Sequence, residues 1–331
     1  MLEQFNGIKQ LFRTVYQRHG SILGIDINPT AVYMVELGYD HKSLSLISYA
    51  HASFPASQAD NGAPATQLVF KEFISQNNQS GKRTVTALPD QQAISKSLTL
   101  NSGLSLEEFE ASIALEVRKS IPHKWSELSW DYQTLELNET NLEQNVLLVA
   151  AKTEHIHSHM ELLHFAGLKP QAIELVSHAV ERAAQYIFPR MTGNLQNKNV
   201  ALIQISASSL LFFLVHQNKI VFMREVHFDC TYSDNKSFEA LLAQQIQQVV
   251  EYTQATNPLF IQHILLMGEL AVEGTNFAQR VELNLGIVTQ LANPVVDFYD
   301  PNHHLSEDLL HIAPALWIAV GLALRVLDGK N

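Results

Sequence analysis

Two stretches of the chain share one order of apolar and polar positions. Residues 21–54 begin with a short apolar run around Asp26, which is followed by a small polar turn and two further β-rich runs. Residues 199–228 repeat this order, and Gln204 occupies the place that Asp26 has in the first stretch. Short apolar runs bounded by turn residues are typical of strands, so each stretch is predicted to form three consecutive strands. One such group used twice, each time followed by helices, predicts two similar α/β lobes with a cleft between them.

Outside the repeated stretches, apolar residues recur every three or four positions, which is the period of one helix face. Ser105 and Glu108 form a capping box that predicts the start of one helix, with Leu104 placed to pack against Phe109. Further helices are predicted at 66–76, 153–165, 176–188, 238–254 and 275–285, and further strands at 84–88, 130–136, 145–151 and 261–267.

Residues 312–324 are apolar almost all round. This run is shorter than the about 20 residues that a membrane-spanning helix needs. It therefore predicts a buried core helix, which we expect to extend over about 313–327. Ala315, Ala319 and Ala323 recur at a spacing of four and give this helix a narrow side for close packing.

The first twenty residues predict an amphipathic helix. Apolar side chains recur at steps of three and four over residues 2–16, and Lys9 and Arg13 lie on the opposite side. One interpretation is a helix that docks on its own domain. The other is a basic helix that lies on an anionic membrane or meets a partner.

Composition narrows the function classes. Hydrophobic residues make up 46% of the chain and charged residues 17%, which is enough apolar material for a packed core. The net charge is −11, from 22 basic and 33 acidic residues. An acidic chain repels nucleic-acid phosphates, so non-specific binding to nucleic acid is disfavoured. A single cysteine, Cys230, excludes an internal disulfide framework and a four-cysteine zinc site.

The motifs of common catalytic sites are missing from the sequence. There is no nucleophile elbow, phosphate-binding P-loop or dinucleotide-binding glycine motif. His155 and His159 share one face of a predicted helix at the spacing of zinc ligands, but a zinc site needs a third ligand from elsewhere. We expect these histidines to be solvated surface residues, and we name no catalytic residue.

A set of short motifs, in this order along the chain, resembles the type IV pilus assembly protein PilM, an FtsA-like branch of the actin-like ATPase superfamily. The motifs are 24–27, 105–108, 113–116, 121–122, 131–132, 166–170, 224–225, 292–294, 314–315 and 319–325. Each motif alone is weak, and their shared order over about 21–328 carries the resemblance. FtsA and the cytoplasmic part of GspL are more distant relatives.

The resemblance implies an α/β, two-lobed actin-like fold, which is a duplicated ribonuclease H-like fold. It implies lobe 1 at 21–197 with an FtsA-like inserted subdomain at about 84–165, lobe 2 at 198–307, and a C-terminal helix at 308–328 that returns to lobe 1. It also implies a cytoplasmic scaffold at the inner membrane that serves type IV pilus biogenesis, and with it twitching motility and competence.

The implied partner is the N-terminal cytoplasmic tail of the membrane protein PilN, with other pilus assembly proteins or further copies of the chain as additional partners. An extended tail can add to a sheet edge, and the β-rich runs 84–88, 94–100 and 130–135 are the candidate edges. Under the membrane interpretation of residues 2–16, this segment would assist by keeping the complex near anionic lipid.

The implied cofactors are ATP and Mg²⁺. By the resemblance, nucleotide would contact Asp26, Asn28, Thr30, Ser206, Ser208 and Gly268, and Asp26 would hold Mg²⁺ through the nucleotide.

Several positions depart from the family's nucleotide motifs. Asn28 replaces a turn glycine, Tyr33 a lysine and Gln204 a carboxylate, and Glu269 lies in the adenosine turn. A second glycine is replaced by Ser206, and an arginine by Gln248. Losing the lysine removes a charge that would offset the triphosphate, and Glu269 adds an opposing one. The prediction is a scaffold with nucleotide binding weakened or lost, and with doubtful ATPase activity. The alternative is a switch of the same fold in which Mg-ATP closes the lobes. A sugar kinase would need a catalytic aspartate that we cannot nominate.

Overall fold

The computed structural model describes residues 20–39, 43–54, 64–101, 103–120, 127–138, 143–191, 193–228, 235–271, 276–298 and 306–327. The amphipathic helix predicted for residues 1–20 lies outside these ranges except for its last residue. The described residues belong to two compact units. The first unit takes the described residues from 64 to 176, and the second unit takes those from 20 to 54 and from 177 to 327.

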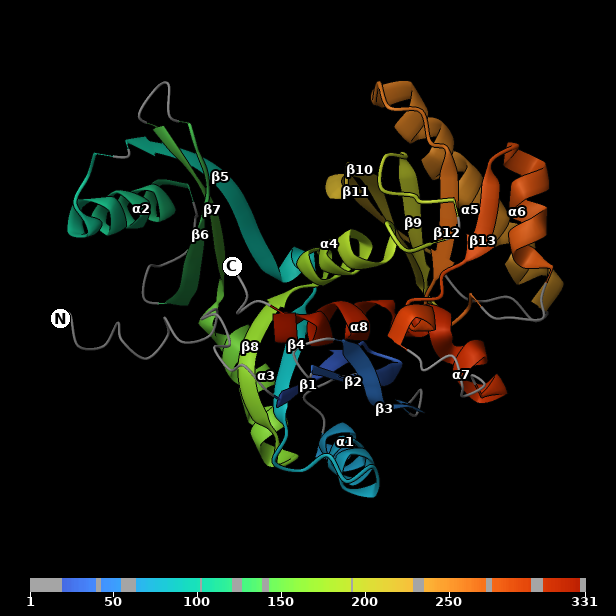
Figure 1. Cartoon of the computed structure of the whole chain (residues 1–331), viewed down its shortest axis with the longest axis horizontal. Helices are drawn as coiled ribbons and strands as arrows, with labels where there is room; N and C mark the ends of the chain where they lie inside the picture. The colour runs from blue at the N-terminus through green and yellow to red at the C-terminus, as the bar shows by residue number, and fades with distance from the viewer. Residues whose placement is uncertain are drawn as a thin grey trace. The chain divides into compact units, whose positions relative to one another are not determined.

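The first unit contains a parallel strand pair, a three-stranded antiparallel sheet and three helices (Figure 1). Its elements are α1 (Pro64–Gln76), β4 (Arg83–Leu88), β5 (Ala93–Asn101), α2 (Leu106–Ser120), β6 (Leu128–Asn138), β7 (Glu143–Lys152), α3 (Thr153–Phe165) and β8 (Lys169–Leu175). β4 and β8 pair in parallel, and the three-stranded sheet has the order β5-β7-β6. The predicted hairpin of 130–136 and 145–151 is confirmed as β6 and β7.

Helix α2 covers one face of the three-stranded sheet because its apolar residues recur at a spacing of four. Phe109, Ile113 and Val117 pack in one cluster with strand residues such as Val146 and Leu148. The predicted capping box is present at the start of this helix. The Ser105 backbone N–H donates to a Glu108 carboxylate oxygen at 2.9 Å, and the Glu108 N–H donates to Ser105 Oγ at 3.4 Å.

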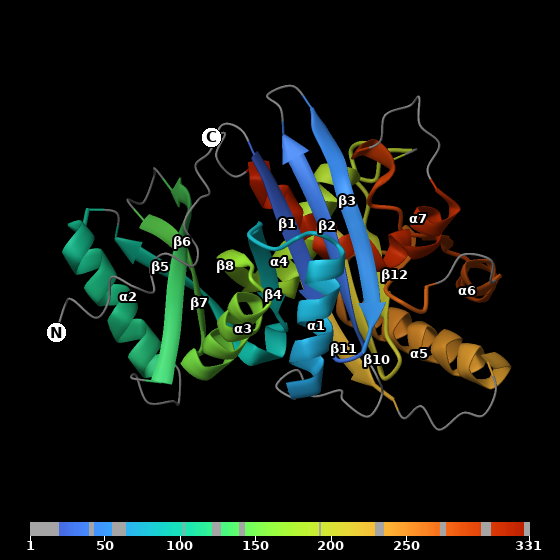
Figure 2. The same cartoon turned by 90° about the horizontal axis from the view of Figure 1, so that it is seen from below.

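The second unit contains the two repeated stretches and the helices that pack on them (Figures 1 and 2). The first repeat is β1 (Gly20–Ile27), β2 (Ala31–Tyr39) and β3 (Leu44–Ser53), and the second is β9 (Val200–Ile205), β10 (Ser209–His216) and β11 (Lys219–His227). The remaining elements are α4 (Val176–Ile187), α5 (Asn235–Thr256), β12 (His263–Met267), α6 (Phe277–Leu285), β13 (Val288–Leu291), α7 (Glu307–Ile312) and α8 (Trp317–Ala323).

The two repeats are confirmed as equivalent hairpins with the same register. Asp26 of β1 pairs with Tyr33 of β2, and Gln204 of β9, its counterpart, pairs with Leu211 of β10. In both repeats the third strand then pairs antiparallel with the second. The second repeat continues through β12 and β13, which pair in parallel, into a five-stranded sheet of order β11-β10-β9-β12-β13.

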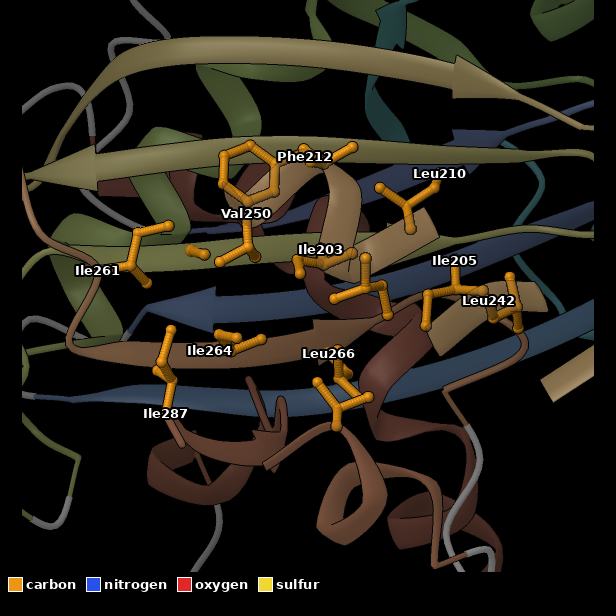
Figure 3. Close-up of a cluster of buried hydrophobic side chains, with 14 of the residues drawn as sticks. Ile203, Ile205, Leu210, Phe212, Leu242, Val250, Ile261, Ile264, Leu266 and Ile287 are labelled. Carbon is orange, nitrogen blue, oxygen red and sulfur yellow. The ribbon is translucent and has the colours of Figure 1, made fainter. Parts of the chain in front are cut away.

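One apolar cluster joins this five-stranded sheet to the helices beside it (Figure 3). Alternate side chains of β9, β10 and β12 supply one part, and the inner face of α5 supplies another. The members labelled in Figure 3 are Ile203, Ile205, Leu210, Phe212, Leu242, Val250, Ile261, Ile264, Leu266 and Ile287. The period of two in the strands and of about 3.6 in α5 brings these side chains together.

The predicted C-terminal core helix exists over almost the expected residues, but it is less regular than expected. A 3-10 segment, Ala313–Leu316, interrupts it between α7 and α8 at Pro314, which has no backbone N–H to donate. Among the described residues, Glu307–Leu327 is the helical stretch that is long and apolar enough to cross a membrane, yet 78% of its most apolar window is buried inside the protein. The expected burial of this helix is therefore confirmed.

Two glycines let α8 pack closely on both of its sides. A Cβ at Gly24 of β1 would lie 2.1 Å from the Ala319 carbonyl oxygen of α8. A Cβ at Gly321 of α8 would lie 2.0 Å from the Ala179 carbonyl oxygen of α4. The predicted alanine stripe thus contributes Ala319 to the contact with β1, and a glycine that the pattern did not single out makes the contact with α4.

Candidate functional site

The two hairpin turns of the second unit are closed by the same backbone hydrogen bond. The Asn28 N–H donates to the Ala31 carbonyl at 3.0 Å, and the Ser206 N–H donates to the Ser209 carbonyl at 3.0 Å. The β1–β2 turn (residues 28–30) and the β9–β10 turn (residues 206–208) therefore have equivalent backbones.

The strand that follows each hairpin is tied back to its turn in the same way. The Thr30 carbonyl accepts a hydrogen bond from the Phe54 N–H at 2.6 Å, and the Ser208 carbonyl accepts one from the Phe228 N–H at 3.0 Å. Each turn is thus fixed by two backbone hydrogen bonds, one within the hairpin and one to the end of the third strand. The backbone positions from which the turn side chains extend are therefore defined.

Side chains of the turns already occupy several of their backbone donors. Asn28 Oδ1 accepts hydrogen bonds from the Thr30 N–H at 2.9 Å and from the Ala31 N–H at 2.7 Å. Ser206 Oγ accepts one from the Ser209 N–H at 3.1 Å. Backbone N–H groups in such turns are the usual donors to phosphate. Asn28 does not have a positive φ, so its side chain, and not a glycine-like backbone, closes the turn.

A third turn follows β12 and depends on a glycine. Gly268 has φ +99°, and a Cβ there would lie 2.4 Å from the Ile205 carbonyl oxygen at the end of β9. Its N–H donates to the Pro314 carbonyl at 3.0 Å. Since no other residue fits this position without a shift of the backbone, Gly268 fixes where the next residue, Glu269, leaves the strand.

The Glu269 carboxylate contacts both hairpins. Thr30 Oγ1 lies 3.0 Å from each of its oxygens. The Ala207 N–H of the other turn donates to Oε1 at 3.2 Å, and the Tyr33 hydroxyl of β2 donates to Oε2 at 3.4 Å. We call these contacts of Glu269 with Thr30, Tyr33 and Ala207 the Glu269 bridge.

The surroundings of this bridge disfavour further negative charge. Asp26, at the end of β1, is 6% exposed. Burial, and secondly the charge of Glu269, raise the pKa of Asp26 from its ordinary 3.8 to about 7. Burial and the same carboxylate also raise the pKa of Tyr33. The three groups are therefore electrostatically coupled.

The residues predicted to bind nucleotide lie in these three turns and at the end of β1. Only some of them contact Glu269. Thr30 contacts the carboxylate directly, and Gly268 precedes it in the chain. Ser208 is exposed, and Ser206 bonds within its own turn, to Ser209. The Ala207 N–H and the Tyr33 hydroxyl are donors that sequence reasoning missed. The one local signal for them was a carboxylate directly after the turn glycine.

Several N–H donors of the turns already bond to Asn28, Ser206 and Glu269, and the Glu269 carboxylate contacts both turns. A triphosphate at these turns would have to displace those bonds. In the part of the chain that the structure describes, no three His, Cys, Asp or Glu side chains group to hold a metal ion.

The histidines of α3 differ from the sequence expectation. His157 is exposed, as expected, whereas His155 and His159 are half-buried and the Nδ1 atoms of both are buried without a hydrogen-bond partner. Burial, followed by the neighbouring His155, lowers the pKa of His159 to about 4. The prediction that these are solvated surface residues is wrong for His159, because its helix face packs inward.

Comparison with solved structures defines the class of protein. One similar structure is titled "PilM-PilN type IV pilus biogenesis complex" and is 20% identical, with a TM-score of 0.70 over 94% of this chain and 99% of that one. Another is the ethanolamine utilization protein EutJ from Carboxydothermus hydrogenoformans, 11% identical with a TM-score of 0.51 over 98% of this chain and 96% of that one. With the duplicated hairpins, these likenesses place the chain among proteins of the two-lobed actin-like ATPase fold, as predicted.

The family follows from the sequence match. The family model described as "Type IV pilus assembly protein PilM" matches residues 24–237, which is more than half of the chain. The chain belongs to this family, and the predicted resemblance is confirmed.

Proposed function

We propose that this chain is an actin-like scaffold of type IV pilus assembly that binds the N-terminal cytoplasmic tail of a PilN-like membrane protein. The main support for this proposal is the family match together with a structural likeness, over 94% of the chain, to a protein solved as a PilM–PilN complex. In this proposal the chain works in the cytoplasm at the inner membrane, where its partners hold it. Other pilus assembly proteins and further copies of the chain are secondary partners.

The proposal retains the predicted division into lobe 1 (21–197, with the insertion at about 84–165), lobe 2 (198–307) and a returning helix (308–328). Residues 2–16 lie outside the described residues, and their proposed role is contact with anionic lipid. Lys9 and Arg13 would each add about 1 kcal/mol to that contact.

Strand β5 is the proposed docking edge for the tail. It is a terminal strand of its sheet, and its pairing with β7 runs without a shift from Ala93 to Asn101. The other terminal strand, β6, has an irregularity between Thr134 and Leu137, and such bulges bend a strand and interrupt pairing. The third candidate run, 84–88, is buried in β4 and offers no accessible surface.

An extended tail on β5 would gain main-chain hydrogen bonds from the strand and specificity from alternate side chains. Ser95, Ser97 and Thr99 of β5 are exposed. They alternate along the strand and share the sheet face that bears Leu147 and Val149, because each residue of β5 shares a face with its partner on β7. Ordering a disordered peptide costs several kcal/mol, so we expect micromolar affinity from a short tail.

Calorimetric titration of the tail peptide into the full chain tests this proposal. We expect Ser97→Arg on β5 to weaken binding at least tenfold. The matched substitution Gln133→Arg, at an exposed position of β6, should leave binding unchanged. If the folded wild-type chain binds no peptide at several hundred micromolar, the proposed binding of a PilN-like tail is refuted. Equal weakening by both substitutions would contradict the β5 edge as the docking site.

We also propose that nucleotide binding is weakened in this chain. The bonds of Asn28, Ser206 and Glu269 to the turn N–H groups support this, because a triphosphate would have to displace them. Any residual Mg-ATP binding would use the predicted residues Asp26, Asn28, Thr30, Ser206, Ser208 and Gly268, with Mg²⁺ near Asp26.

The alternative, a switch driven by Mg-ATP, makes a different prediction for thermal melting. Nucleotide at 100 times its dissociation constant should stabilise the chain by about 2.7 kcal/mol. A stabilisation of this size that disappears in Asp26→Ala would favour the switch. No shift at millimolar Mg-ATP would favour the scaffold with its nucleotide function lost.

A further inference from the structure

The contacts of Glu269 join parts of the second unit that are far apart in the sequence. Thr30 and Tyr33 belong to the first hairpin, and Ala207 belongs to the turn of the second. The carboxylate therefore reaches two repeats that are themselves built alike.

The donors around Glu269 are of the kinds that hold an oxyanion. They are an aliphatic hydroxyl, a phenolic hydroxyl and a backbone N–H, and none of them carries a positive charge. Such donors bind phosphate and carboxylate oxygens alike, and charge on the acceptor strengthens each bond. In this structure all three donors contact the half-buried carboxylate of Glu269.

The position of this carboxylate is built into the backbone. Gly268 can approach the end of β9 only because it lacks a Cβ, and its N–H is bonded to the Pro314 carbonyl. The next residue, Glu269, is therefore presented to the turns from a fixed point. Both the glycine and the glutamate are needed to place an anion there.

From this geometry we propose that Glu269 is an internal anion, which bridges the two hairpin turns in place of a phosphate-bearing ligand and blocks that ligand's site. The inference rests on, and deepens, the proposal that nucleotide binding is weakened. The Glu269 bridge holds the hairpins in one arrangement without nucleotide. Removing the carboxylate takes away the acceptor that Thr30, Tyr33 and Ala207 share, so an added anion can take its place.

The test uses the full chain as wild type, Glu269→Ala and Glu269→Gln, with Glu307→Gln at an exposed position of α7 as the control. Calorimetry with inorganic tripolyphosphate and with ATP, each with Mg²⁺, measures the site. We expect at least tenfold tighter binding of both by Glu269→Ala than by wild type, an intermediate gain for Glu269→Gln, and no gain for the control. The Gln variant keeps the side-chain volume and one acceptor, so it tests the proposal if the Ala variant does not fold.

Amide hydrogen exchange gives a second readout that needs no ligand. The Ala207 N–H should exchange at least tenfold faster in Glu269→Ala, and adding tripolyphosphate to that variant should slow it again. Unchanged exchange at Ala207, or wild-type affinity for tripolyphosphate equal to that of Glu269→Ala, overturns the proposal. Failure of the wild-type chain to bind the tail peptide leaves both readouts intact, so the two proposals fail separately.

Discussion

Replacing Asp26 by asparagine should remove the contribution of Asp26 to the pH dependence of the free energy of unfolding. Asparagine has the shape of the protonated carboxyl but cannot ionise. In the folded chain the pKa of Asp26 is about 7, whereas its ordinary value is 3.8. Between these two values the unfolded chain loses the proton and the folded chain keeps it. Wild-type stability therefore falls as the pH rises from about 4 to about 7, and then levels off.

The magnitude follows from the shift. At about 1.36 kcal/mol per pKa unit, ionising Asp26 costs the folded chain about 4 kcal/mol above pH 8. Asp26→Asn does not pay this cost, so its free energy of unfolding should exceed that of wild type by a margin that grows by about 2 to 3 kcal/mol between pH 5 and pH 8. In a Glu269→Gln background the margin should shrink without vanishing, because burial is the larger cause of the shift.

Urea unfolding followed by circular dichroism at pH 5 and pH 8 measures this margin. Asp308→Asn, at an exposed aspartate in the first turn of α7, is the matched control and should show no growing margin. A constant difference between Asp26→Asn and wild type at the two pH values would refute the reasoning. Asp26 would then ionise equally in the folded and unfolded chain.

Two further substitutions test the packing and capping described above. Gly321→Ala should destabilise the second unit by about 3 kcal/mol or more, because its Cβ would lie 2.0 Å from the Ala179 carbonyl oxygen. Thermal melting measures this loss. The control Gly103→Ala, at an exposed turn, should be nearly neutral. Ser105→Ala should cost the first unit about 1 kcal/mol by removing the cap of α2, and Ser112→Ala inside that helix should cost nothing, by urea unfolding; equal effects of the two serines would contradict the capping role.

Local signals located most of the elements, and the missed strands have identifiable causes. The helix at 153–165 was predicted with its exact bounds, because its apolar periodicity ends at a glycine. Strand β8 was missed because Pro170 marks a break in a sequence pattern. In the structure the pairing of β8 with β4 shifts between Thr84 and Val85, and this irregularity accommodates the proline. Strand β13 has four residues, too few to show a period.

The candidate site was only partly predictable for a different reason. The repeated pattern placed Asn28 and Ser206 in equivalent turns, and the family resemblance added Gly268. The role of Glu269 was not predictable, because its contact with Thr30 spans 239 residues of sequence and depends on how three turns meet. Sequence reasoning flagged Glu269 as an unfavourable charge for a ligand, but only the folded chain supplies its partners.

The burial of α8 against β1 has a consequence for synthesis on the ribosome. Gly24 in β1 is covered by a helix that is translated about 290 residues after β1 ends. At about 5 to 20 residues per second, the first hairpin emerges about 15 to 60 seconds before the helix that shields it. The nascent chain thus carries an unshielded apolar strand for most of its translation, and a chaperone that holds such strands has its longest opportunity at this hairpin.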